Sequence, residues 1–144
     1  MKTVIFICTG NTCRSPMAQA IAEKILREKG LEVKADSAGI YAIDGQSISE
    51  NSALALETLF GIQGFKHPAK PLTKELLQEA DLVIAMTEHH KALIGQAFGE
   101  TEKVIAMPIS VGDPFGGTPA LYEACAKSIA EGIEALWDKG YFHD

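Results

Sequence analysis

The sequence predicts an α/β fold: a single domain with a four-stranded parallel sheet flanked by helices on both faces. Strand-like and helix-like segments alternate along the chain, which is typical of βαβ units. The first strand-like run, residues 3–7, is apolar without alternation, as expected of a central strand buried on both faces. A chain of 144 residues suits one domain, so we expect that domain to span residues 1–144.

Four short runs are expected to form the strands of the sheet. These runs are residues 3–7, 32–37, 81–85 and 103–106.

The first two helices are indicated by their ends. Ser15 is interpreted as an N-cap followed by Pro16, and Gly30 suits a left-handed helix end. Residues 47–50 have capping-box spacing, and the apolar face that follows them ends at Gly61.

Three more helices complete the expected fold. Thr73 is expected to cap a short helix, and another helix covers residues 88–97. Thr118 and Pro119 are expected to open the last helix, after a loop rich in proline and glycine. The inner face of this helix is expected to carry Leu121, Cys125, Ile129, Gly132 and Leu136.

Composition narrows the function classes. Hydrophobic residues make up 47% and charged residues 22%, as in ordinary soluble proteins. The formal net charge of −6 argues against a nucleic-acid binder, which would carry a basic face. We see no signal peptide and no apolar stretch of membrane-spanning length. Three cysteines, an odd number, argue against a disulfide scaffold, so we expect a reducing, cytoplasmic location.

The segment between the first strand and the first helix is suited to binding an anion. A loop at that place, residues 8–15, can aim successive backbone N–H groups inward, and the helix dipole adds positive potential. Gly10 and Asn11 tolerate the positive φ that such a nest requires. The expected phosphate contacts are Thr9, Gly10, Asn11, Thr12, Cys13 and Ser15.

Two side chains of this loop predict phosphoryl transfer. Cys8, at the mouth of the nest, is expected to be a thiolate nucleophile, and the Ser15 hydroxyl can stabilise its sulfur. Arg14 lies six residues further on, where its planar fork can hold two phosphoryl oxygens. The alternative is a strand-to-helix turn with an incidental cysteine. The strand before the loop and the helix after it favour the phosphate site.

Residues 8–16 resemble the active-site loop of low-molecular-weight protein tyrosine phosphatases and their bacterial relatives. The resemblance covers nearly the whole chain. Further matches, in the same order, are residues 36–39, 67–70, 80–86 and 113–114. The resemblance implies that Asp113 is the general acid, which then activates the water of the second step. Without the resemblance, Asp113-Pro114 would be interpreted as a turn, in which this dipeptide is common.

The resemblance also implies supporting roles. Asn11, Ser37 and His67 match positions that brace the loop through hydrogen bonds. Cys13 matches a cysteine that can trap the oxidised nucleophile as a disulfide. The alternative for Cys13 is a small residue buried beneath the loop.

Thr12 and Phe115 bear on the substrate. Together with Asp113, they resemble the protein-arginine-phosphatase branch, whereas tyrosine-specific members carry a bulkier aliphatic residue at the position of Thr12. A hydroxyl beside the phosphorus suits the polar guanidinium of phosphoarginine, and Asp113 could pair with that group. We therefore expect a protein-arginine phosphatase, with a low-molecular-weight protein-tyrosine phosphatase as the alternative.

Two further classes are weighed. Arsenate reductase chemistry needs additional cysteines around residues 80–95, where this sequence has none, so this less favoured alternative requires an external thiol such as glutathione. A non-catalytic phosphate-binding module has no need of Cys8, Arg14 and Asp113 together. We expect no metal and no cofactor, because the cysteines lack zinc spacing, and His89 and His90 are interpreted as solvated. The expected partners are phosphorylated proteins, with inorganic phosphate as product, and the expected state is a monomer.

Overall fold

A computed structural model of the chain describes residues 1–143. Its sheet has four strands in the order β2-β1-β3-β4, and every neighbouring pair is parallel. The strands are β1 (Lys2–Cys8), β2 (Val33–Gly39), β3 (Leu82–Ala85) and β4 (Val104–Ala106). The predicted fold class is confirmed, and each predicted strand differs from the observed one by no more than two residues at either end.

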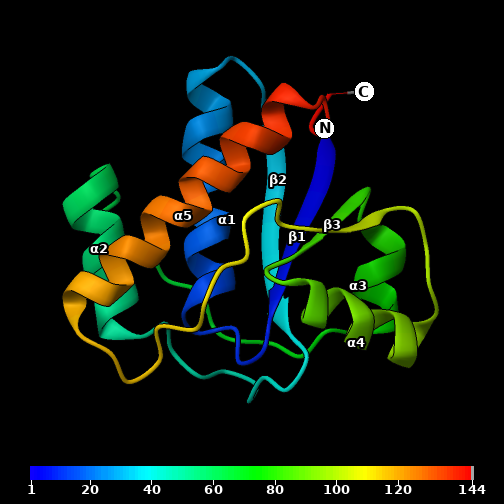
Figure 1. The fold of residues 1–144 in the computed structure, drawn as a ribbon, viewed down its shortest axis with the longest axis horizontal. Helices are drawn as coiled ribbons and strands as arrows, with labels where there is room; N and C mark the ends of the chain where they lie inside the picture. The colour runs from blue at the N-terminus through cyan, green and yellow to red at the C-terminus, as the bar shows by residue number, and fades with distance from the viewer. Residues whose placement is uncertain (144) are drawn as a thin grey trace.

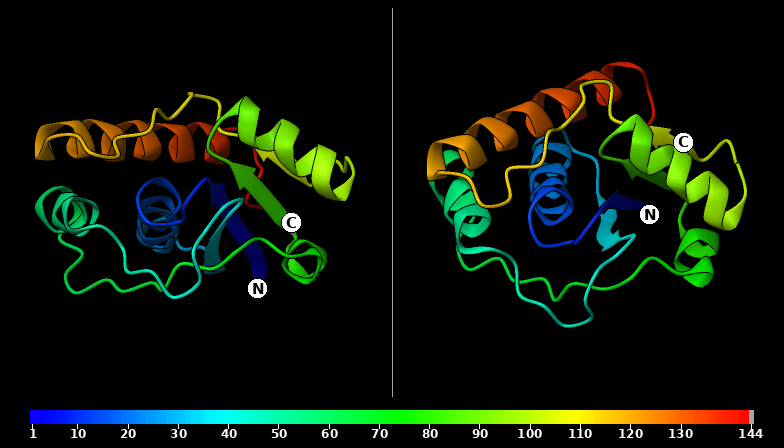
Figure 2. Two further views of the ribbon diagram at one scale, coloured as in Figure 1. Left: turned by 90° about the horizontal axis from the view of Figure 1, so that it is seen from below. Right: turned by 60° about the horizontal axis from the view of Figure 1, so that its bottom comes forward.

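Helices cover both faces of this sheet (Figures 1 and 2). They are α1 (Arg14–Glu28), α2 (Glu50–Phe60), α3 (Lys74–Glu79), α4 (Glu88–Phe98) and α5 (Pro119–Asp138). Helices α1, α2 and α5 pack against one another on one face, whereas α3 and α4 lie on the other. None of the helices within residues 1–143 has the length and apolarity that crossing a membrane requires.

The central strand β1 divides the core in two. Val4 and Phe6 belong to the apolar cluster beneath α1 and α5, whereas Ile5 and Ile7 belong to the cluster beneath α3 and α4. Successive residues of a strand point to opposite faces, so a strand covered on both faces must be apolar throughout. This is why residues 3–7 lack alternation.

Two predicted helix starts are wrong. Helix α1 begins at Arg14 with Cys13 as N-cap, because the Ser15 hydroxyl lies inside the first turn and bonds to loop side chains instead. Helix α2 begins after Ser49, whose hydroxyl accepts the backbone N–H of Ser52. The capping-box pattern at residues 47–50 therefore starts two residues too early.

The remaining caps agree with expectation. Thr73 caps α3 and Thr118 caps α5 through their side-chain oxygens. Gly30 and Gly61 take positive φ at the ends of α1 and α2. One member of the predicted inner face of α5 is wrong: Leu121 is 48% exposed, and the neighbouring Tyr122 is buried in its place.

The loops after β1 and β4 come together at the carboxyl edge of the sheet. Parallel strands end at one edge, and ligands of open α/β sheets bind there. The Cys8 end of β1 pairs with Gly39 of β2, and the loop that follows Cys8 contacts the segment after β4 through Arg14 and Val111.

Candidate active site

The loop between β1 and α1 turns through Asn11, which has a φ of 58°. Asparagine tolerates this left-handed conformation better than most side chains. Gly10 does not have positive φ, so this part of the prediction holds for Asn11 alone. A second glycine has a steric role: a Cβ on Gly39 would lie 2.5 Å from the carbonyl oxygen of Thr9. Gly39 therefore allows the loop to lie close to the end of β2.

Cys8 is buried at the start of the loop, with its Sγ 2.9 Å from the hydroxyl oxygen of Ser15. The Asn11 side-chain amide donates to that same oxygen at 2.8 Å. Because the Ser15 oxygen accepts from Asn11, its own hydrogen is free to point at the sulfur. This arrangement directs a hydrogen-bond donor at Cys8 and suits a thiolate.

A buried network holds Asn11 from behind. The backbone N–H of Lys70 donates to Asn11 Oδ1 at 3.1 Å, and His67 Nε2 lies 2.8 Å from the same oxygen. The Asn11 Oδ1 is an amide carbonyl oxygen, which can only accept, so His67 Nε2 carries the hydrogen. Burial lowers the pKa of His67 by more than the charge of Asp36 raises it, so the ring is neutral at pH 7. Ser37 lies 3.2 Å from Nε2 and donates to Gln19 at 2.6 Å.

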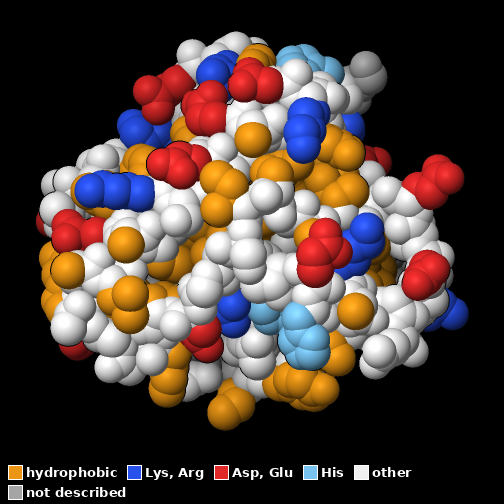
Figure 3. Space-filling view, in the orientation of Figure 1, with side chains coloured by type: hydrophobic (Ala, Val, Ile, Leu, Met, Phe, Trp, Pro, Cys, Tyr) orange, Lys and Arg blue, Asp and Glu red, His pale blue; other side chains and the backbone are white. Residues whose placement is uncertain are grey.

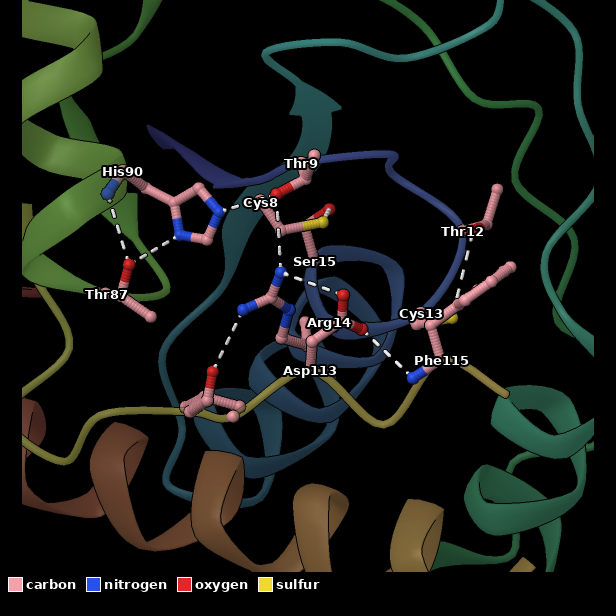
Figure 4. Close-up of polar contacts among 12 residues, drawn as sticks. Cys8, Thr9, Thr12, Cys13, Arg14, Ser15, Thr87, His90, Asp113 and Phe115 are labelled. Atoms are coloured by element: carbon pink, nitrogen blue, oxygen red, sulfur yellow. Dashed lines mark hydrogen bonds and ion pairs between the residues drawn. The ribbon is translucent and has the colours of Figure 1, made fainter. Parts of the chain in front are cut away.

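Arg14 lies in the first turn of α1 and is 6% exposed. Its Nη1 donates to the carbonyl oxygen of Val111 at 3.1 Å, and its Nη2 donates to Thr9 Oγ1 at 3.4 Å. Asp113 Oδ2 lies 3.7 Å from the same Nη2. Figure 4 shows the guanidinium between Thr9 and Asp113. Contacts from two loops thus fix the plane of the guanidinium.

Asp113 and Phe115 belong to the loop between β4 and α5. The backbone N–H of Phe115 donates to Asp113 Oδ1 at 3.0 Å, which orients the carboxylate. The Asp113 side chain is 54% exposed and Phe115 is 78% exposed, so both are accessible at the rim. Their loop lies opposite the loop that carries Cys8.

A cavity of about 280 Å³ separates these two loops. It is lined by Cys8, Thr9, Gly10, Asn11, Thr12, Cys13, Arg14, Gln46, Asp113 and Phe115. The structure therefore brings most of the predicted site residues to one cavity. Ser15, Ser37 and His67 are buried behind the loop. Gln46 was not predicted, because no local pattern places the β2–α2 loop at the site.

Comparison with known proteins gives the family. A model of the family described as low molecular weight phosphotyrosine protein phosphatase matches residues 3–139. The chain belongs to this family. It is 39% identical to the protein-arginine-phosphatase of Bacillus subtilis (strain 168) over 142 residues, covering 92% of this chain and 93% of the relative.

Two solved structures of phosphatases are similar along their whole length. A low molecular weight protein tyrosine phosphatase from T. tengcongensis has a TM-score of 0.91 at 34% identity, covering 96% of this chain and 99% of that one. A cysteine-to-serine mutant of the YwlE arginine phosphatase, with a phosphorylated active-site serine, has a TM-score of 0.89 at 36% identity. Coverage there is 95% of this chain and 94% of the mutant.

In this member of the phosphatase family, Cys13 lies beneath the loop among polar partners. Its Sγ is 3.6 Å from the Ser49 hydroxyl and 3.7 Å from the Tyr122 hydroxyl. Burial raises the pKa of Tyr122, and its hydrogen bond to Cys13 acts in the same direction. Cys13 is 5% exposed, so these contacts lie inside the protein. Its pairing with Cys8 under oxidation stays a prediction.

The expectation that His90 is solvated is wrong. His89 is exposed, but His90 is only 4% exposed and contacts the loop between β1 and α1, with Nε2 2.9 Å from Thr9 Oγ1. Adjacent residues of a helix point in different directions, so one ring faces solvent and the other faces the site. Burial lowers the pKa of His90 to about 4, with the charge of Arg14 as the next contribution.

Proposed function

We propose that this protein is a phosphatase that hydrolyses phosphorylated protein side chains through a cysteinyl-phosphate intermediate. The observation that carries this proposal is that Cys8, Arg14 and Asp113 line one cavity of about 280 Å³. Cys8 supplies a nucleophile, Arg14 an anion clamp and Asp113 a proton donor. Family membership supports the same chemistry.

In the first step, the Cys8 thiolate attacks phosphorus, and the S–P bond forms as the bond to the leaving group breaks. Arg14 and the backbone N–H groups of the loop hold the equatorial oxygens, where charge is concentrated in the transition state. Asp113, in its acid form, gives its proton to the leaving nitrogen or oxygen. The products are a cysteinyl-phosphate and the unmodified side chain.

In the second step, water attacks the phosphorus while Asp113 takes one of its protons. The S–P bond breaks and its electron pair returns to Cys8 as a thiolate. The Ser15 hydroxyl, 2.9 Å from Sγ, would donate to that sulfur and stabilise it as a leaving group. Inorganic phosphate then leaves, and the cycle closes with no net oxidation.

We propose phosphoarginine as the preferred substrate. The 39% identity to the Bacillus subtilis protein-arginine-phosphatase supports this choice. Thr12, Asp113 and Phe115 line the same cavity, where a hydroxyl and a carboxylate would both suit a guanidinium. Phosphotyrosine is the second candidate, because the T. tengcongensis tyrosine phosphatase is similar over nearly the whole chain.

A release assay separates these candidates. Matched peptides carrying phosphoarginine, phosphotyrosine or phosphoserine would be given to the wild type and to Cys8→Ser. We expect rapid Cys8-dependent release from phosphoarginine, and mass spectrometry of the variant should detect a phosphoryl group on the introduced serine. Release chiefly from phosphotyrosine would overturn the substrate assignment, and release that persists in Cys8→Ser would overturn the nucleophile.

We also propose that the protein acts as a monomer in the cytoplasm and binds neither nucleic acid nor membrane. All three cysteines lie within the described residues as free thiols, which suits a reducing compartment. The net charge is −6, and on the face drawn in Figure 3 the Lys and Arg side chains are interspersed with Asp and Glu. Sedimentation at working concentration tests the monomer.

A further inference from the structure

We propose that His90 is a positioning residue, which links α4 to the phosphate loop through Thr9 and holds the Arg14 guanidinium in its phosphate-binding orientation. The inference rests on the proposed phosphatase function, because it assigns Arg14 the role of clamp. Neither the loop motif nor the expected role of Asp113 predicts a function for His90.

Both ring nitrogens of His90 have partners. Nδ1 lies 2.8 Å from Thr87 Oγ1, and Nε2 lies 2.9 Å from Thr9 Oγ1. Figure 4 shows the imidazole between these two threonines. With the ring 4% exposed and fixed at both nitrogens, Thr9 Oγ1 has one defined position relative to α4.

Thr9 Oγ1 is also a support for Arg14, since it accepts from Nη2 at 3.4 Å. The other supports are the Val111 carbonyl oxygen at 3.1 Å and the exposed Asp113 carboxylate at 3.7 Å. The Asp113 carboxylate is 54% exposed and 3.7 Å away, so solvent screens this contact, and the two hydrogen bonds are the closer supports of the guanidinium.

The guanidinium has open space on the side of Thr9. A second cavity, of about 770 Å³, lies beside α4 and the segment after β4, and it is lined by Thr9, Arg14 and His90. Arg14 thus borders both cavities. Without a fixed Thr9 hydroxyl, the guanidinium could turn toward the larger cavity and leave the phosphoryl oxygens.

The hydrogen bonds can all form with an uncharged ring. An Arg14 N–H only donates, so Thr9 Oγ1 accepts it, and the Thr9 hydroxyl can still donate to or accept from Nε2. The charged or titratable groups that act on the ring are Arg14, His89 and Asp113. With its pKa lowered to about 4, His90 adds no second positive charge beside Arg14 at pH 7.

The helix cap does not explain the imidazole. Thr87 caps α4 by accepting the backbone N–H of His90 at 3.1 Å, which any residue except proline would offer at position 90. The ring adds the contact to Thr9, which joins two segments 81 residues apart. A role confined to the cap of α4 would not account for the contact between His90 and Thr9.

A matched pair of variants separates the two ring contacts. The amide of Gln reaches about as far as Nε2 and can keep the bond to Thr9, whereas the amide of Asn reaches only to the Nδ1 position. We expect His90→Asn to lower kcat/KM for p-nitrophenyl phosphate about ten-fold and to weaken inhibition by inorganic phosphate similarly. His90→Gln should recover most of both values. His89→Asn, at the exposed neighbour, is the control.

A double-mutant cycle with Thr9→Val tests the route to Arg14. If His90 acts through the Thr9 hydroxyl, His90→Asn should have little further effect in the Thr9→Val background. Equal effects in both backgrounds, or wild-type behaviour of His90→Asn, would overturn the inference. If His90→Asn fails to fold, Thr9→Val and His90→Gln test the inference instead. Weakened inhibition of Thr9→Val by phosphate, together with near-wild-type inhibition of His90→Gln, would support the positioning role. Any other pattern would overturn it.

Phosphate binding also separates this inference from the proposed function. If the wild type shows no Cys8-dependent turnover, the proposed function fails, and calorimetric binding of inorganic phosphate still tests His90. Weaker binding to His90→Asn than to His90→Gln would then keep the positioning role. Equal binding to both would remove it.

Discussion

Arg14 Nη2 lies 3.7 Å from Asp113 Oδ2, so the proposed clamp and the proposed acid contact each other across the rim of the cavity. A bound phosphoryl group would compete with Asp113 for the guanidinium, because its oxygens carry more charge and lie within the nest. Substrate binding would then release the carboxylate to turn toward the leaving group. The hydrogen bond from the Phe115 backbone to Oδ1 would keep it at the rim during that movement.

Replacing Asp113 with Asn should separate substrates by their leaving groups. The Asn side chain keeps an oxygen for the Phe115 N–H, but its amide has no acidic proton to transfer to the leaving group. We expect kcat for phenyl phosphate to fall by about 10²–10³-fold and kcat for an activated aryl phosphate to fall much less. Steady-state kinetics on both esters measure this, with Asp138→Asn at the exposed end of α5 as control. Equal losses on both esters would contradict the acid role.

Replacing Thr12 with Ile should shift substrate preference toward phosphotyrosine. Thr12 lines the cavity beside the nucleophile, where a hydroxyl suits a guanidinium and an aliphatic group suits an aromatic ring. We expect the ratio of kcat/KM for phosphoarginine over phosphotyrosine to fall about ten-fold. Thr12→Ser keeps the hydroxyl and should retain the wild-type ratio. An unchanged ratio in Thr12→Ile would remove Thr12 as the source of specificity.

Asn11 should contribute to stability both through its hydrogen bonds and through its backbone conformation. Its side chain is fully buried and contacts Ser15, His67 and Lys70, so Asn11→Ala leaves their buried polar groups without this partner. We expect a loss of about 3 kcal/mol in the free energy of unfolding, measured by urea denaturation. Asn11→Gly loses the same bonds but accepts a φ of 58°, so it should be about 1 kcal/mol more stable than Asn11→Ala. The reverse order would show that φ is not limiting.

His90 should make stability depend on pH in a defined window. Burial lowers its pKa from 6.5 to about 4, so between these values the unfolded chain binds a proton that the folded protein does not. The contribution of His90 is therefore fully present above pH 6.5 and is lost as pH falls toward 4. The unfolding free energy of His90→Gln should fall less steeply across this window than that of the wild type.

Urea denaturation of both proteins at several pH values between about 7 and 4.5 measures this difference in slope. The lowered pKa of His67 acts in the same direction but is common to both proteins, so it cancels in the comparison. His89→Gln, which alters the exposed neighbouring ring, is the matched control. Parallel curves for the wild type and His90→Gln would show that the His90 ring is not buried in solution.

Much of the fold could be predicted, because its signals are local. The unbroken apolar run at residues 3–7 identifies a strand covered on both faces, and Thr73, Thr118 and Gly61 mark helix ends by their own side chains or φ. The start of α1 could not be predicted in this way. A serine before a proline is a typical helix start, but here the Ser15 hydroxyl bonds to Cys8 and Asn11.

The sequence by itself determined the order of the elements and the identity of the loop that carries Cys8 and Arg14, since both depend on residues close together in the chain. The family resemblance already implied that Asp113 meets that loop. Only the tertiary structure decided which further distant residues do: Gln46 comes from the β2–α2 loop, and His90 lies on α4. Their positions depend on how strands pair and helices pack. The spacing of residues along the chain does not encode how close they lie in the folded protein.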